Sequence, residues 1–219
     1  MQINNLNEKI TLILSFLILN NYLFLSLSFP SILIKINFLT LLFIILVFYF
    51  KNLLENPFLK IFFLIIIIIS LGTPTYEWDP RSIWLFHAKR IFYDNSIFSV
   101  VDNYAVFSHN DYPTLAPALA ASLASLIGHW NEVFPKLSFS LMFLPPLILI
   151  FSFLKSTQYL FFLNIVFFVI GKYLFNGWVD GLVAVYFCIS AFLMYILIIN
   201  NTSQYKNRIL YLLIAFCFL

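Results

Sequence analysis

Three aspartates lie where apolar segments meet polar ones, and they are the side chains in this sequence best suited to chemistry. Asp79 lies in EWDPR, Asp111 in HNDYP and Asp180 in GWVDG. Each has an ordinary structural alternative: an N-cap for a helix that Pro80 begins, an Asx turn before Pro113, and an Asp-Gly turn. A carboxylate at such a boundary can also act as a general base. Because the chain holds only nine acids, three in similar positions favour a shared role.

Basic and aromatic side chains accompany two of these aspartates. The cations and histidines could bind an anion, such as the phosphate of a lipid-linked substrate, and they are Arg81, His87, Lys89, Arg90 and His109. Their ordinary alternative is anchoring at a membrane interface, where basic and aromatic side chains are enriched. Four tryptophans could form a platform for a sugar, but the sequence favours the same interfacial anchoring for them: Trp78, Trp84, Trp130 and Trp178.

Most of these residues belong to one polar stretch, residues 73–136, in an otherwise apolar chain. The stretch holds six of the nine acids, all three histidines and three of the four tryptophans. The whole chain is 63% hydrophobic and 10% charged, whereas soluble domains carry about 25% charged residues. This composition predicts a membrane protein. With a net charge of +3 and no basic tract, nothing in the sequence indicates a nucleic-acid partner, and it has no P-loop, Rossmann glycine pattern, HExxH or GxSxG.

The apolar runs predict the elements that position these side chains. A membrane-spanning helix needs roughly 20 residues that are mostly apolar. Runs of this kind, some of them shorter, cover residues 9–29, 32–50, 58–72, 137–154, 159–175, 182–199 and 209–219. Pro145 and Pro146 predict a kink in the fourth run, and the first run is expected to be a retained helix rather than a cleaved signal peptide.

Two shorter helices are predicted inside the polar stretch. Residues 81–93 are amphipathic: Trp84, Ala88, Ile91 and Phe92 share one face, while His87, Arg90 and Asp94 share the other, so we expect a helix lying in the membrane interface. Residues 114–127 are apolar but short, and they contain small residues and Pro117. That pattern is typical of a re-entrant or juxtamembrane helix that does not cross.

The distribution of basic residues favours the same topology. If residues 114–127 do not cross, one face carries Lys9, Lys51, Lys60, Lys155, Lys206 and Arg208, and the positive-inside rule makes that face cytoplasmic. The stretch 73–136 and Asp180 then share the outer face. If the segment does cross, Asp180 moves away from the acidic stretch. Lys35 and Lys172 lie near the outer face and count against the first arrangement.

The order of these features resembles the N-terminal part of the GT-C class of membrane glycosyltransferases. This class includes protein O-mannosyltransferases, lipid A aminoarabinose transferases and enzymes that glycosylate lipopolysaccharide core. EWDPRSIWLFHAKRIFYDN resembles their first outer loop, HNDYP resembles an acid shortly before a proline, and NGWVDG resembles an aspartate at the end of a later span. The resemblance covers roughly residues 58–199. Some relatives carry lysine directly before the proline, where this chain has Tyr112.

The resemblance implies inverting transfer of a hexosyl or pentosyl group from a polyprenyl-phosphate sugar to a hydroxyl of a glycan, lipid or protein acceptor. It implies that Asp79 and Asp111 are catalytic. The substrate-binding residues that it implies are Asp180, Arg81, Arg90, His109 and Tyr112. No metal site and no cofactor are expected, although the sequence leaves the question of a divalent cation open.

The expected fold is an all-α membrane protein, a polytopic helix bundle with interfacial juxtamembrane helices in a long outer loop. Residues 1–57 would form two added helices, and residues 58–219 a truncated GT-C-like module in a bacterial inner membrane, its site facing the periplasm or exterior. The alternatives are a transport or assembly protein and an inactive fragment of a transferase. A transporter would place ionisable residues in mid-span, whereas here they lie at the ends of the apolar runs.

Overall fold

The structure is a computed structural model, and it describes residues 5–51, 57–75, 77–97, 108–154, 158, 171, 176–199, 203–217 and 219. Over these residues the regular structure is entirely helical, as the sequence predicts. Within the described ranges, three helices are long and apolar enough to cross a membrane, at Leu6–Ser26, Ser31–Phe48 and Asp180–Ile199. The predicted span over residues 159–175 lies outside the described residues, apart from position 171.

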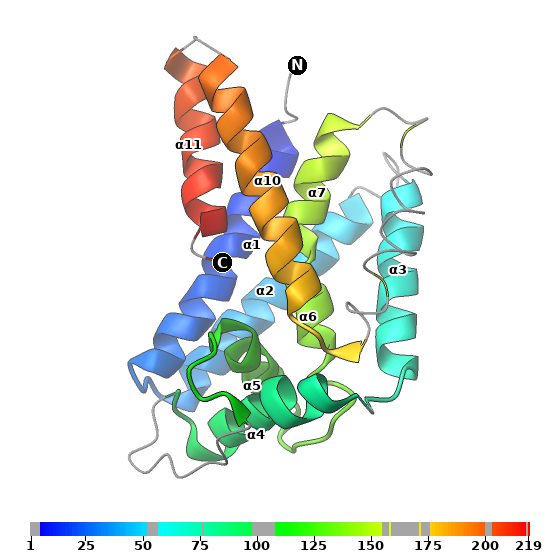
Figure 1. Cartoon of the computed structure of the whole chain (residues 1–219), viewed down its shortest axis with the longest axis vertical. Helices are drawn as coiled ribbons and strands as arrows, with labels where there is room; N and C mark the ends of the chain where they lie inside the picture. The colour runs from blue at the N-terminus through cyan, green and yellow to red at the C-terminus, as the bar shows by residue number, and fades with distance from the viewer. Residues whose placement is uncertain are drawn as a thin grey trace.

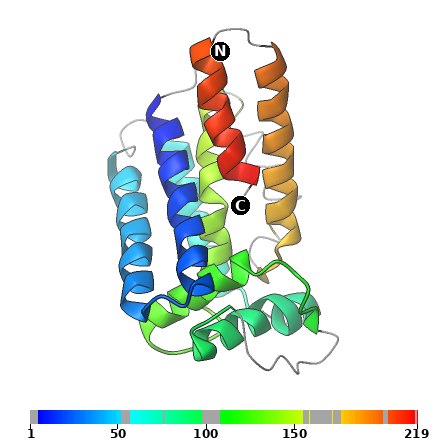
Figure 2. The ribbon, with the colours of Figure 1, turned by 90° about the vertical axis from the view of Figure 1, so that its left-hand side faces the viewer.

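The long helices run side by side, and two shorter ones close one end (Figures 1 and 2). The first three are α1 (Asn5–Ser26), α2 (Ser31–Lys51) and α3 (Pro57–Gly72). A π-helical turn, η1 (Pro80–Trp84), leads into α4 (Leu85–Asp94), and α5 (Leu115–Ile127) follows. The later helices are α6 (Leu137–Met142), α7 (Leu144–Phe153), α10 (Asp180–Ile199) and α11 (Ser203–Cys217).

Proline and left-handed residues set several helix boundaries. The predicted kink in residues 137–154 is confirmed: the helix breaks at Phe143, because Pro145 cannot donate a backbone hydrogen bond to the carbonyl one turn earlier. After α1 the chain turns through Ser28, whose φ is 53°, and α2 begins directly after Pro30. The apolar run predicted over residues 209–219 is part of a longer helix, since α11 begins at Ser203.

Helix α11 begins early because its first turns are composed of residues that tolerate a helix and make a specific contact. Lys and Arg have good helix propensity. Arg208 reaches α1, where its Nε donates a 2.8 Å hydrogen bond to the buried carboxylate of Glu8, and its Nη2 contacts the same oxygen. The two residues lie 200 positions apart in sequence. This pair joins the beginnings of α1 and α11 at the end of the molecule opposite α4 (Figure 1).

Helix α5 lies at the end of the molecule where α10 begins and does not run along the long helices (Figures 1 and 2). It packs against α4, α1, α2 and α6, and Ala116 to Ala124 are buried throughout. A helix that is apolar on all sides is stable only where it is covered on all sides. The alanines allow α4 to pack closely over it. The prediction of a short helix over residues 114–127 is confirmed, since α5 has 13 residues; that it does not cross the membrane stays a prediction.

Candidate functional site

The helix formed by η1 and α4 crosses the end of the long helices and separates two cavities. Trp84 lines a smaller, mostly apolar cavity, whereas Arg81 and Leu85 line a larger, polar one. The π-helical turn closes with a hydrogen bond from the backbone N–H of Leu85 to the carbonyl of Pro80. Because η1 and α4 are continuous, one rigid element positions residues in both cavities.

The apolar cavity has a volume of about 290 Å³ and lies between the start of α10, the start of α5 and α6. Its apolar lining includes Trp84, Met142 and Val183, and its polar lining includes Asp180 and the phenol of Tyr112. Two of the predicted substrate-binding residues, Asp180 and Tyr112, therefore share one cavity.

An aromatic stack extends from this cavity toward solvent. The ring of Tyr112 lies 5.5 Å from that of Trp84 and stacks on the imidazole of His109 at 4.6 Å, with an interplanar angle of 25°. His109 adopts a positive φ of 52°, and the backbone N–H of Tyr112 donates to its carbonyl, so the chain turns tightly here. This turn places His109 beside the cavity without lining it.

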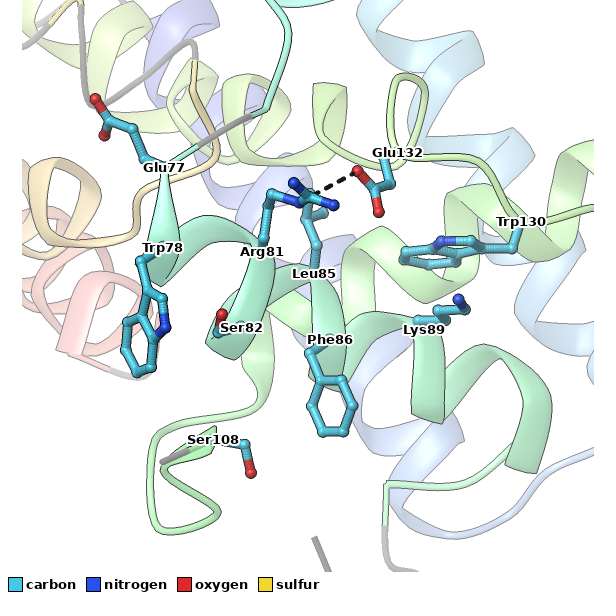
Figure 3. A pocket seen from close by; sticks show the side chains of 10 residues that line it. All are labelled: Glu77, Trp78, Arg81, Ser82, Leu85, Phe86, Lys89, Ser108, Trp130 and Glu132. Carbon is cyan, nitrogen blue, oxygen red and sulfur yellow. Dashed lines mark ion pairs between the residues drawn. The ribbon is translucent and has the colours of Figure 1, made fainter. Parts of the chain in front are cut away.

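The polar cavity has a volume of about 590 Å³ and runs along the outer side of the same helix (Figure 3). Its charged lining comprises Glu77, Arg81, Lys89 and Glu132, two acids and two cations. Arg81 Nε lies 3.9 Å from a carboxylate oxygen of Glu132, and both side chains are about half exposed. Trp78 and Trp130 lie on opposite sides of the Arg81–Glu132 pair in Figure 3.

Asp79 lies at the start of the helix that separates the two cavities, and it lines neither of them. The N-cap alternative for this residue is wrong. Its backbone is already helical, with φ −59° and ψ −49°, and its side chain makes no capping hydrogen bond. Since Pro80 has no N–H and the next donor, Arg81 N, bonds weakly to the Glu77 carbonyl at 3.4 Å, the helix begins without help from this carboxylate.

Asp111 is exposed and lies next to Tyr112 in the turn. The Asx-turn alternative is also wrong, because the turn is closed by the backbone bond between Tyr112 and His109 and by Ser108 Oγ, which donates to Asn110 Oδ1 at 3.1 Å. Asp180 is exposed and is the first residue of α10, where an acid interacts favourably with the helix dipole. The Asp-Gly turn considered for Asp180 is wrong, because Asp180 and the glycine after it are helical; the chain turns instead at Gly177, whose φ is +90°.

Lys136 contacts the two segments that carry Asp79 and Asp180. It is 1% exposed, and its Nζ donates to the carbonyl of Thr73 at the end of α3. A side-chain Cβ at Gly177 would lie 3.5 Å from both Lys136 and Pro80, so these residues are in close contact. Burial lowers the pKa of Lys136, because it disfavours the charged ammonium. The indole N–H of Trp178 donates to Glu77 across the same junction.

The polar face predicted for residues 81–93 is partly wrong. Trp84, Ala88 and Ile91 are buried as expected, but His87 and Arg90 are also buried. Neighbouring segments cover them: His87 Nε2 donates to the carbonyl of Ser108 at 2.7 Å, and Arg90 Nη2 donates to that of Ile97 at 2.6 Å. Arg90 is therefore part of the local fold, and the cations open to a ligand on this helix are Arg81 and Lys89.

Sequence reasoning assigned no role to Lys136 or Glu132, and it took Trp130 as one of four tryptophans at a membrane interface. Lys136, Trp130 and Glu132 lie in GHWNEVFPK, which carried no motif. The available signal was compositional: a lysine directly before an apolar helix, and a tryptophan and an acid two positions apart in a chain poor in acids. Over the described residues, no group of three or more His, Cys, Asp or Glu side chains could hold a metal ion. No protein family, curated protein or solved structure matches the chain.

Proposed function

We propose that this chain is an integral membrane glycosyltransferase that takes a sugar from a polyprenyl-phosphate donor at the membrane face where α4 and α5 lie. One observation carries the proposal: an apolar cavity of about 290 Å³ opens at that end, with Asp180 and Tyr112 in its lining. A site for a lipid-linked sugar needs an apolar space joined to hydrogen-bonding groups, and ligand sites are generally apolar with a few convergent polar groups.

The donor's isoprenoid would occupy the space between Trp84, Met142 and Val183. Its phosphate would meet the hydroxyl of Tyr112 and the imidazole of His109, which stack on one another at the edge of the cavity. Asp180 would accept a hydrogen bond from a sugar hydroxyl. In this arrangement the leaving group is a phosphate, so the protein mostly positions the reactants and stabilises charge.

Asp79 would act as the general base, taking the proton of the acceptor hydroxyl. It lines neither cavity, but it lies at the start of the helix that separates them, next to Trp78 of the polar cavity. It makes no capping bond that would otherwise explain the carboxylate. Asp111, exposed beside Tyr112, would support the same site. The full proposal includes a multi-pass bundle with this end outside the cytoplasm, because Lys9, Lys206 and Arg208 belong to the opposite end.

Photo-crosslinking tests the donor site directly. Purified protein in nanodiscs would be mixed with a polyprenyl-phosphate hexose that carries a diazirine in its isoprenoid, and the labelled peptides mapped by mass spectrometry. We expect labelling of the first turns of α10 and of residues 112–116, with competition by unlabelled polyprenyl phosphate. Val183→Trp, which adds an indole to the lining of the cavity, should weaken this labelling.

The matched control is Ile198→Trp on the same helix, since Ile198 is 75% exposed and far along α10 from the cavity. This variant should label like the wild type. Labelling spread evenly along the exposed faces of the long helices, and unaffected by Val183→Trp, would contradict the proposal. Such a result would mean that the probe reports only general lipid contact.

A further inference from the structure

The larger, polar cavity has features of its own that the donor site does not use. Its lining positions on the dividing helix are 78, 81, 82, 85, 86 and 89, which repeat every three or four residues and so share one helix face. At 1.5 Å per residue these positions extend over roughly 17 Å. The volume of about 590 Å³ lies within the range of about 300–1,000 Å³ typical of ligand sites. The shape is that of an elongated groove.

Aromatic rings stand at both ends of this groove. Trp78 comes from the start of the helix and is 53% exposed, and Trp130 comes from the segment after α5 (Figure 3). The ring of Trp130 is fixed from behind by Phe92, whose centroid lies 6.1 Å away. Its indole Nε1 is buried and has no hydrogen-bond acceptor in the part of the chain that the structure describes.

The charges of the groove balance. Arg81 and Lys89 are opposed by Glu77 and Glu132, and Arg81 already lies 3.9 Å from Glu132. An anionic ligand would be attracted by the two cations but repelled by the two carboxylates. A neutral polyhydroxylated ligand can instead accept from the cations and donate to the carboxylates, and Ser82 can do either. The mixed lining therefore discriminates against phosphates and favours hydroxyl groups.

From these features we infer that the polar cavity binds a neutral oligosaccharide of more than one ring, which serves as the acceptor. Its apolar C–H faces pack on the two indoles, and its hydroxyls bond the charged side chains between them. The identification of this ligand as the acceptor rests on the proposed function, whereas the sugar-binding site itself is argued from the groove alone. It narrows the acceptor from a glycan, lipid or protein to a glycan.

The test is direct binding in the absence of any donor. Protein in nanodiscs would be titrated with maltotetraose, cellotetraose, mannotetraose and chitotetraose, with tryptophan fluorescence and calorimetry as readouts. We expect at least one of these to bind, and Trp78→Ala to weaken it about tenfold or more, which is about 1.4 kcal/mol. Trp78 is half exposed, so its truncation should leave the fold intact. Glu132→Gln should weaken binding less, because one oxygen acceptor remains.

The control is Tyr93→Ala, which removes an exposed aromatic ring of α4 outside the groove and should leave binding unchanged. The inference is overturned if none of the four sugars binds, if a sulfated oligosaccharide binds more tightly than the neutral one, or if Tyr93→Ala and Trp78→Ala act equally. Donor crosslinking without sugar binding would sink this inference alone. Sugar binding without donor crosslinking would sink the proposed transferase and leave the sugar site.

Discussion

Carboxylates at the two ends of the molecule differ in their burial and in their partners. At the end where α1 and α11 begin, Glu8 is 5% exposed and its carboxylate is bound by Arg208. At the end closed by α4 and α5, Asp111 and Asp180 are exposed, and over the described residues neither forms an ion pair. One acid is enclosed by its partner, whereas the others face solvent beside cavities.

This difference separates structural acids from available ones. A buried carboxylate without its cation is strongly unfavourable, so Glu8 and Arg208 depend on each other. An exposed carboxylate without a partner adds little to stability and stays free to meet a ligand. The comparison predicts that substitutions at the end where α1 and α11 begin change stability. Substitutions at the end closed by α4 and α5 should instead change ligand binding.

The largest stability effect is expected at the Glu8–Arg208 pair. Arg208→Gln leaves Glu8 buried without its cation and should lower the free energy of unfolding by about 3 kcal/mol, the low end for buried pairs because Arg208 is about one-third exposed. SDS-induced unfolding in mixed micelles, followed by circular dichroism, would measure it. The double variant Glu8→Gln/Arg208→Gln should recover part of the loss. A loss below about 0.5 kcal/mol would remove the contrast between the two ends.

Because Lys136 is buried, we expect the stability of the protein to depend on pH through this residue, which lies at the end closed by α4 and α5. In the folded state burial lowers its pKa below the ordinary value of 10.5, so the unfolded chain binds more protons between the two pKa values. Stability should therefore rise with pH up to about pH 10.5, by at most about 1.4 kcal/mol per pH unit. Lys136→Met should flatten this rise. Exposed Lys89→Met is the control and should retain it, and a wild-type protein whose stability falls over this window would contradict the burial of Lys136.

Asp180 should contribute a small amount through the helix dipole. As the first residue of α10 it interacts with the positive end of the helix, and Asp180→Asn should cost about 0.5 kcal/mol. The same unfolding titration, repeated at high salt, would show the cost shrinking because the interaction is screened. A cost above about 2 kcal/mol would mean that Asp180 has a structural partner and stabilises the fold, as Glu8 does.

The smallest stability effect is expected at Asp79. Because its side chain makes no capping bond, Asp79→Asn and Asp79→Ala should each change the unfolding free energy by less than about 0.5 kcal/mol. A working N-cap would instead cost about 1 kcal/mol on replacement by alanine and almost nothing by asparagine. Unequal stabilities of the two variants would therefore restore the capping role.

Local signals were enough to predict much of the fold. Hydrophobic length identified α1, α2 and α10, proline located the break at Phe143, and small residues identified α5 as a short helix. What could not be predicted depends on contacts between distant residues. In sequence His87 and Arg90 look like a solvent-facing stripe, but in the structure both are buried and donate to the carbonyls of Ser108 and Ile97.

The candidate site shows the same limit. The sequence indicated Asp180 and Tyr112, and they do share a cavity. It gave no sign that Lys136 would reach a carbonyl 63 residues away, or that Trp130 and Glu132 would complete a groove with the helix at residues 78–89. Such pairings follow from the way α4 crosses the ends of the long helices, which no local pattern encodes.

Sugar transfer itself tests the central claim most directly. Membranes containing wild type, Asp79→Asn or Asp79→Ala at matched expression would be supplied with a radiolabelled polyprenyl-phosphate hexose and an oligosaccharide acceptor, and transferred label counted. If the carboxylate of Asp79 is the general base, both variants fold normally and lose transfer by a factor of about 10² to 10⁴. If Asp79→Asn transfers at the wild-type rate, Asp79 is not the base, and the assignment of chemistry to this end of the molecule is contradicted at its main residue.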